Sequence, residues 1–262
     1  MILDDCYISY LNLDSRIDRL MLLESRLHDL GIKAVRTRGK LPEDYDRDDW
    51  RLQTMFKRTP GAVPCHFGQV SIMEQAFKIG KHAFVMEDDL VIAEDFHERI
   101  AYIEKFIKTH EWDIIWLNAT FHINPPHWHN GTNPLLRESN LGRDAELTDD
   151  PRMIRTYGCF STHAYIVRDK SIEKVLRFLD DHLHTSIGID YLMIKMQPQI
   201  FSYSFVPGII KQYNNKSNIG DGWTMYENFS KLNGTIENSR YWWQNKASDF
   251  DPLTFDWKEA TL

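Results

Sequence analysis

The sequence predicts an α/β protein with a mostly parallel central sheet flanked by helices. Short apolar runs typical of buried strands alternate with amphipathic segments of helical periodicity, and polar residues directly follow two of these runs. Alternating strands and helices form parallel sheets with right-handed crossover connections. Ligands bind such sheets at the carboxyl ends of the strands, so the polar residues mark the expected site.

In the N-terminal part, residues 6–11 are interpreted as a buried strand. Asp14-Ser15, with Asp18 three residues after Ser15, is expected to cap a helix that stops at Gly31. The apolar face of that helix is assigned to Ile17, Leu20, Leu23, Leu27 and Leu30. The further expected elements are a strand at 33–37, a loop with a short helix around 50–56, a helix over 66–79, a strand over 82–86, a helix that Asp95 caps, and a strand over 112–117.

In the C-terminal part, residues 118–152 are expected to form a long loop, because Pro-Pro, Asn-Gly and Asn-Pro pairs interrupt every pattern. Strands are expected at 161–167 and 200–206, with a helix from residue 169 or 171 and a short helix near Asp190. No composition shift or repeat marks a boundary, so residues 1–262 are interpreted as a single domain.

Composition excludes several classes of function. The 262 residues are 42% hydrophobic and 26% charged, as in a globular protein, and the net charge of −7 argues against nucleic-acid binding. No basic-apolar leader and no apolar run of about 18 residues occurs, so neither a signal peptide nor a membrane span is predicted. The 3 cysteines are far apart and fit reduced thiols of a cytoplasmic protein.

The strongest candidate site is Glu87-Asp88-Asp89, at the end of the apolar run 82–86. Three adjacent carboxylates repel one another and favour a compensating cation. Oxygen ligands suit Mg²⁺ or Mn²⁺, and Mg²⁺ typically binds one or two carboxylates together with the phosphates of a substrate. A solvated acidic turn is the alternative interpretation.

Asn12, Asp14 and Arg16 follow the first strand and are candidates for ligand binding, although Asp14 is also a candidate helix cap and Arg16 a candidate surface charge. Asp190 is a candidate general base, with a helix cap as its alternative.

Two further stretches are less specific. The loop that holds His122, His127, Trp128 and His129 lacks a third zinc ligand of convincing spacing and is interpreted as an acceptor-binding lip or a surface loop. The aromatic C-terminal stretch is interpreted as packing over the sheet, with contact between Tyr241-Trp242-Trp243 and a lipid-linked acceptor as the alternative.

The order of these segments resembles glycosyltransferase family 25, which contains lipooligosaccharide and procollagen galactosyltransferases. Four patches carry the resemblance, and they resemble, in order, the opening Ile-Asn-Leu-Asp-Arg-x-x-Asp-Arg strand, the central Leu-Glu-Asp-Asp, a Gly-Thr-x-Ala-Tyr segment and a late Gln…Ser-Asp-Ile of the family. In this chain they are residues 7–19, residues 84–89, residues 162–167, and Gln212 with Ser217-Asn218-Ile219.

The chain departs from the family pattern at two places. Gly68-Gln69 stands where the family has Ser-His, and Asn218 replaces an aspartate. These departures affect the details of donor and acceptor binding that the resemblance implies.

The resemblance implies a GT-A fold, that is, a Rossmann-type sandwich, with a UDP-sugar donor and Mn²⁺ or Mg²⁺. It divides the chain into a nucleotide-sugar-binding half, 1–118, and an acceptor-binding half, 119–262. It implies Asp89 as the first metal ligand and Glu87 as the second, and Asp190 as the base that accepts the proton of the acceptor hydroxyl. The residues implied for donor binding are Asn12, Asp14, Arg16, Asp88, Gln212 and Ser217.

The expected function is therefore metal-dependent transfer of a hexose, galactose or glucose, from a UDP-sugar to a hydroxyl of a glycan acceptor, with inversion. The expected location is the cytoplasm, with the cytoplasmic membrane face as the site of any peripheral contact. A nucleotidyltransferase, a metal-dependent phosphohydrolase and a non-catalytic glycan-binding domain are the alternatives.

Overall fold

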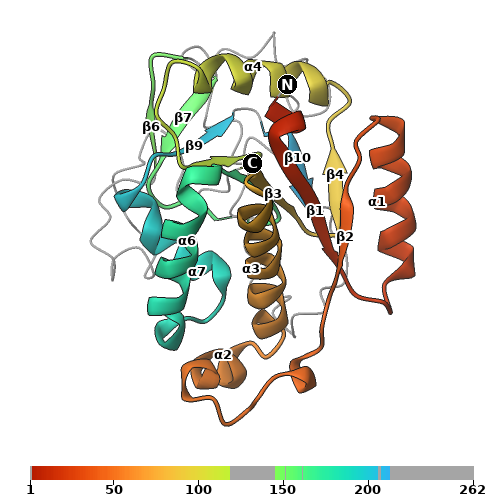
Figure 1. Cartoon of the computed structure of the whole chain (residues 1–262), viewed down its shortest axis with the longest axis vertical. Helices are drawn as coiled ribbons and strands as arrows, with labels where there is room; N and C mark the ends of the chain where they lie inside the picture. Colours follow the sequence, from red (N-terminus) through yellow and green to blue (C-terminus); the bar gives the residue numbers. More distant parts are fainter. Residues whose placement is uncertain (1, 119–144, 151, 161, 206–207, 213–262) are drawn as a thin grey trace, which may run out of the picture. The chain divides into compact units, whose positions relative to one another are not determined.

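The computed structural model describes residues 2–118, 145–150, 152–160, 162–205 and 208–212 (Figure 1). The chain divides into two compact units, each built from separate stretches of sequence. The first unit contains Met1–Val91, Thr162–Met193 and Gln212–Trp223, and the second contains Ile92–Ser161, Ile194–Lys211 and Thr224–Leu262. The expected single domain and its division after residue 118 stay predictions.

The first unit holds a sheet in the strand order β2-β1-β3-β8. Strands β1 (Cys6–Asn12), β2 (Val35–Arg38) and β3 (His82–Met86) are parallel, whereas β8 (Ala164–Val167) runs antiparallel to β3. The chain leaves β1 for β2 on one side and returns to β3 on the other. Such a reversal of strand order is the place where open α/β sheets bind ligands.

The helices of the first unit cover this sheet. Right-handed crossovers place α1 (Ile17–Asp29) and α3 (Ala62–Ile79) on opposite faces, and Figure 1 shows them on either side of β1. Helix α3 packs against β1 and β3 and lies beside α6 (Asp169–Asp181). Gly80 ends α3 with a φ of 68°, a left-handed conformation that glycine adopts without strain. The other elements here are η1 (Ile2–Asp5), η2 (Pro42–Asp44), η3 (Trp50–Leu52), α2 (Gln53–Arg58), η4 (Leu183–Thr185) and the start of α7 (Ile189–Met196).

The second unit has a mixed sheet. Strand β5 (Ile114–Trp116) is parallel to β9 (Ser202–Phe205), which pairs antiparallel with β7 (Met153–Thr156), and β7 pairs antiparallel with β6 (Ala145–Leu147). Helix α4 (Phe96–Ile107) and η5 (Gln197–Gln199) belong to this unit. Strands β4 (Leu90–Ile92) and β10 (Ile210–Gln212) form a separate two-stranded sheet.

The α/β class with helices flanking a central sheet is confirmed, and most expected elements lie where the sequence places them. Beside the expected parallel pairs, the structure has antiparallel pairs of β3 with β8, of β6 with β7 and of β7 with β9. Strands β4 and β10 were not expected, and residues 145–147 form a strand inside the expected loop. No described helix is long and apolar enough to cross a membrane.

Helix α1 differs from the expectation in its cap and in its buried face. Its N-cap residue is Arg16, without a side-chain cap, so Asp14 does not cap it. Its buried residues are Arg19, Leu23 and Leu27, whereas Ile17 is exposed. An arginine therefore lies on the buried face of the helix, where the periodicity of the sequence predicts apolar residues.

Candidate functional site

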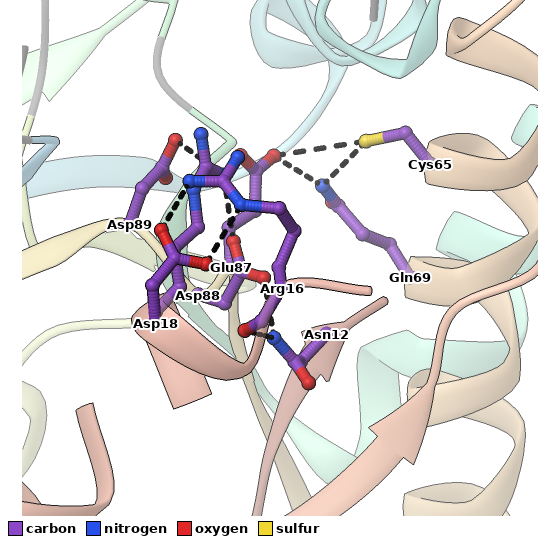
Figure 2. Close-up of polar contacts among 9 residues, drawn as sticks. Asn12, Arg16, Asp18, Cys65, Gln69, Glu87, Asp88 and Asp89 are labelled. Atoms are coloured by element: carbon purple, nitrogen blue, oxygen red, sulfur yellow. Dashed lines mark hydrogen bonds and ion pairs between the residues drawn. The ribbon is translucent and has the colours of Figure 1, made fainter. Parts of the chain in front are cut away.

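Polar side chains of β1 and β3 meet at the carboxyl ends of these two strands. Tyr10 is in register with Met86, so Asn12, two residues on, comes level with Asp88. The Asn12 Nδ2 atom donates to Asp88 Oδ2 over 2.7 Å, and both side chains are buried (Figure 2). The strand-end residues singled out by sequence thus form one site at the reversal of strand order.

The positive side chain of Arg19 compensates part of the negative charge of the acidic triplet. Arg19 Nη1 donates to Asp88 Oδ1 over 2.8 Å and lies 3.0 Å from Asp89 Oδ2. All three side chains are buried. A guanidinium bridging two buried aspartates balances much of their charge. Sequence reasoning missed this role of Arg19, although Arg19 lies one helical turn before Leu23 and two before Leu27, which is the signal that could have found it.

Glu87 is held separately from the two aspartates. Gln69 Nε2 donates to Glu87 Oε1 over 3.0 Å, and the Cys65 thiol lies 3.7 Å from the same oxygen. Burial, followed by the negative charges of Asp89, Asp190 and Asp88, raises the pKa of Glu87 well above its usual value. Part of this shift is repulsion from neighbouring carboxylates that Arg19 does not fully offset.

Asp190 lies in the first turn of α7, one residue after the helix begins, and not at the N-cap. Its Oδ1 atom accepts hydrogen bonds from the backbone nitrogen and from the hydroxyl of Thr162, both over 3.0 Å. Its charge is among those that raise the pKa of Glu87, so the two carboxylates are within electrostatic reach of each other. Thr162 precedes His163, whose backbone oxygen accepts from the backbone nitrogen of Glu87 over 2.9 Å, so the residue that binds Asp190 lies beside the acidic triplet.

Asp14 and Arg16 lie on the loop between β1 and α1, and they have different partners. Arg36 Nε donates to Asn12 Oδ1 over 2.9 Å, and Arg36 Nη2 donates to Asp14 Oδ1 over 2.8 Å, which links Asp14 to the site through Asn12. Arg16 is partly buried and pairs with Asp18 through two hydrogen bonds, and this pairing lowers the pKa of Asp18 to about 2. The assignments of Arg16 to ligand binding and to a surface charge both stay predictions.

The remaining expected site residues lie at or beyond the limit of the described part of the chain. Gln212 is the last residue of β10, and its side chain is outside the description. Ser217, Asn218, the loop with His122, His127 and His129, and the aromatic stretch around Tyr241-Trp242-Trp243 lie outside the described residues. Their assignments stay predictions.

The departure Gly68-Gln69 has a structural explanation. A Cβ atom at Gly68 would come within 2.5 Å of Leu11 Cδ1, so glycine lets α3 pack directly on β1. Gln69 is fully buried and hydrogen-bonds Glu87. Gly68 therefore serves the packing of α3 on β1, whereas Gln69 contacts the acidic triplet.

The donor atoms of the site fit a divalent cation that is shared with a substrate. Within the described residues no group of three or more His, Cys, Asp or Glu side chains forms a metal-binding cluster of its own. Each Asp88 oxygen already accepts one hydrogen bond, from Asn12 or from Arg19. Glu87 and Asp89 have carboxylate oxygens, the type of atom that Mg²⁺ or Mn²⁺ binds beside phosphate oxygens. The donor set thus suits a cation held partly by the protein and partly by a phosphorylated ligand.

Comparisons with known proteins add little to this geometry. No protein-family model matches the chain, and no curated protein matches it. Among solved structures, the chain is similar to an inositol-1-phosphate CTP transferase from T. maritima, at 12% sequence identity and a TM-score of 0.35. That match covers 87% of this chain and 77% of the other.

His66, next to Cys65 on α3, gives a pH prediction. It is buried, its Nδ1 atom has no hydrogen-bond partner among the described residues, and burial lowers its pKa to about 4. An unfolded histidine with a pKa of about 6.5 takes up a proton first as the pH falls, so this contribution to stability is complete above that pH and is lost on the way to pH 4. We expect His66 to account for a loss of about 3 kcal/mol over this range.

Urea denaturation at pH 7 and pH 4 compares the wild type with His66→Gln. The variant should lose less stability between the two values, by about 3 kcal/mol, since glutamine does not titrate. His28 is exposed, and His28→Gln serves as the control for the substitution itself. Equal pH dependence of the wild type and His66→Gln would refute the assignment.

Proposed function

We propose that this protein is a metal-dependent glycosyltransferase that moves a hexose, galactose or glucose, from a UDP-sugar to a glycan hydroxyl with inversion. One observation carries the proposal: at the strand-order reversal, Asn12 and Arg19 organise Asp88 and Asp89 while further carboxylates gather beside them. This arrangement supports binding of a polar, phosphorylated donor at the ends of β1 and β3.

In the proposed site Asp89 and Glu87 hold Mn²⁺ or Mg²⁺. When bound, the cation would balance the negative charge that develops on the leaving diphosphate. Arg19 keeps the two aspartates in place, and Asp88 retains a second lone pair on each oxygen for a donor hydroxyl. Asn12, Asp14 and Arg16 line the loop where the nucleoside would bind, with Gln212 and Ser217 assigned to the donor from the family resemblance.

Asp190 is the proposed general base. Its Oδ1 atom is fixed by Thr162, which orients the carboxylate. A base positioned in this way accepts the proton of the acceptor hydroxyl as that oxygen attacks the sugar, and a single displacement inverts the anomeric carbon. The acceptor would be a glycan or glycoconjugate. A cytoplasmic location, with contact at the membrane face, belongs to the same proposal.

Isothermal titration of the protein with UDP tests the donor assignment. With Mn²⁺ present we expect binding with a dissociation constant between about 1 µM and 1 mM, the usual range for enzyme substrates. With EDTA in place of Mn²⁺ the affinity should fall, because the acidic site then repels the diphosphate. Absence of UDP binding in the presence of Mn²⁺ would rule out the proposed donor.

A nucleotidyltransferase or a metal-dependent phosphohydrolase is the second candidate, because both also use carboxylates at strand ends with a cation. Incubation with UDP-sugar and water reveals a hydrolase, and incubation with nucleoside triphosphate and sugar phosphate reveals a nucleotidyltransferase. Product formation in either mixture, without transfer to any glycan, would replace the first proposal.

A further inference from the structure

Gln69 and Tyr165 form a buried hydrogen-bonded pair behind the acidic triplet. Tyr165, on β8, donates its hydroxyl proton to Gln69 Oε1 over 2.9 Å, and the other end of the same amide donates to Glu87 Oε1 over 3.0 Å. Both side chains are fully buried. Figure 2 shows Gln69 and Cys65 of α3 pointing towards Glu87. A continuous path of polar contacts therefore runs from the sheet through α3 to Glu87.

The direction of these hydrogen bonds is set by chemistry. An amide nitrogen only donates, and that of Gln69 faces Glu87 Oε1. The amide oxygen then faces Tyr165, which can donate to it. The Tyr165 hydroxyl thus favours one of the two orientations of the amide, and a flipped amide would set its oxygen against the oxygen of Glu87.

The side chain at position 69 also keeps Glu87 in place despite the repulsion from neighbouring carboxylates. Asp88 and Asp89 are fixed by Arg19, but no described hydrogen bond joins Arg19 to Glu87. The side chain of Glu87 contacts Gln69 and Cys65, and its backbone nitrogen donates to His163 O over 2.9 Å. A neutral donor at 69 offsets part of the repulsion between Glu87 and its acidic neighbours without adding a charge.

We propose that Gln69 is a positioning residue for the donor site: oriented by Tyr165, it holds Glu87 in place for the cation that is shared with the donor diphosphate. This inference rests on the proposed function, in which Glu87 is a metal ligand. Residues that support a metal ligand typically contribute about 10-fold to 100-fold in metal affinity. Tyr165 acts through Gln69 and should contribute less.

The test measures UDP binding in the presence of Mn²⁺ by isothermal titration. Gln69→Leu removes the hydrogen bonds of the amide with Glu87, Tyr165 and Cys65, and should weaken binding about 10-fold to 100-fold. Tyr165→Phe removes only the hydroxyl and should weaken binding by a smaller factor. The double variant should bind no more weakly than Gln69→Leu alone, because residues of one network are not additive. Gln69→His keeps a hydrogen-bond donor and should restore part of the affinity.

Gln197 provides a matched control. It is also fully buried and makes two hydrogen bonds, with the backbone nitrogen and the backbone oxygen of Cys159, in the second unit. Gln197→Leu should destabilise the fold but leave UDP affinity unchanged. An equal loss of affinity in Gln197→Leu would show that general destabilisation explains the effect, and would overturn the inference.

Steady-state kinetics distinguishes a specific effect on the donor site from a general loss of structure. The KM for the donor should rise in Gln69→Leu, while the KM for the acceptor stays unchanged. If the wild type fails to bind UDP with Mn²⁺, the proposed function is wrong. If the wild type binds and Gln69→Leu binds equally well, only the role of Gln69 is wrong. Should Gln69→Leu not fold, Tyr165→Phe decides alone, and an unchanged affinity in that variant overturns the inference.

Discussion

Replacement of Arg19 by methionine is expected to lower the free energy of unfolding by about 3–5 kcal/mol. Arg19 is buried and contacts Asp88 and Asp89, which are themselves buried. Methionine fills a similar volume but leaves two buried carboxylates without their cation. Urea denaturation at pH 7 in the presence of EDTA measures the loss.

Two further measurements sharpen this prediction. Arg177 pairs with Glu173 on the exposed face of α6, so Arg177→Ala should cost only about 0.3–0.5 kcal/mol. Millimolar Mn²⁺ should stabilise Arg19→Met more than the wild type, because a divalent cation replaces the missing guanidinium. A loss in Arg19→Met no greater than in Arg177→Ala would show that Arg19 does not compensate the aspartates.

The buried arginine also explains what sequence reasoning gained and missed at this site. Three consecutive carboxylates after an apolar strand predicted a divalent cation, which stays a prediction, whereas the positive charge that the structure places beside them is that of Arg19. The carboxylates are adjacent in sequence, whereas Arg19 precedes Asp88 by 69 residues. Periodicity sorts residues by hydrophobicity, so it assigned the buried face of α1 to leucine and isoleucine. Periodicity cannot predict that a charged residue is buried when its partner lies far away in the sequence.

The fold was predictable where local patterns decide it. Strand β3 occupies the expected residues 82–86, and α3 ends at Gly80 because a left-handed residue stops the helix there. The direction of β8 was not predictable, since an apolar run has the same pattern in parallel and antiparallel pairing. The short strands β4 and β10 have three residues each, too few to show any periodicity.

The candidate site was predictable in part because strand ends fix positions. Once β1 and β3 are parallel neighbours, their register alone brings Asn12 to Asp88. The role of Gln69 was not predictable, because it depends on a hydroxyl from β8 and a carboxylate from the end of β3 converging on one helix position. Sequence reasoning recorded Gln69 only as a departure from a family pattern.

Asp89→Asn and Asp190→Asn are expected to show opposite kinetic signatures. Both carboxylates act on Glu87 through their charge, and each substitution keeps an oxygen acceptor of nearly the same shape. Asp89 is the proposed metal ligand, so Asp89→Asn should weaken UDP binding in the presence of Mn²⁺ by more than about 100-fold, beyond the effect of a supporting residue. Its stability should change little, because Arg19 keeps Asp88 and one repulsive charge is removed.

Asp190→Asn should leave that UDP affinity intact and lower kcat by about 10²-fold to 10⁴-fold, the usual contribution of a general base. Its amide oxygen can still accept the hydrogen bonds from Thr162, so the local structure is preserved. Titration with UDP and single-turnover transfer, measured on both variants, give the two quantities separately. Loss of UDP binding in Asp190→Asn would show that Asp190 takes part in donor binding and would contradict its assignment as the base for the acceptor. Full activity of Asp89→Asn would remove the acidic triplet from the mechanism, since Asp89 is the carboxylate on which the metal assignment chiefly depends.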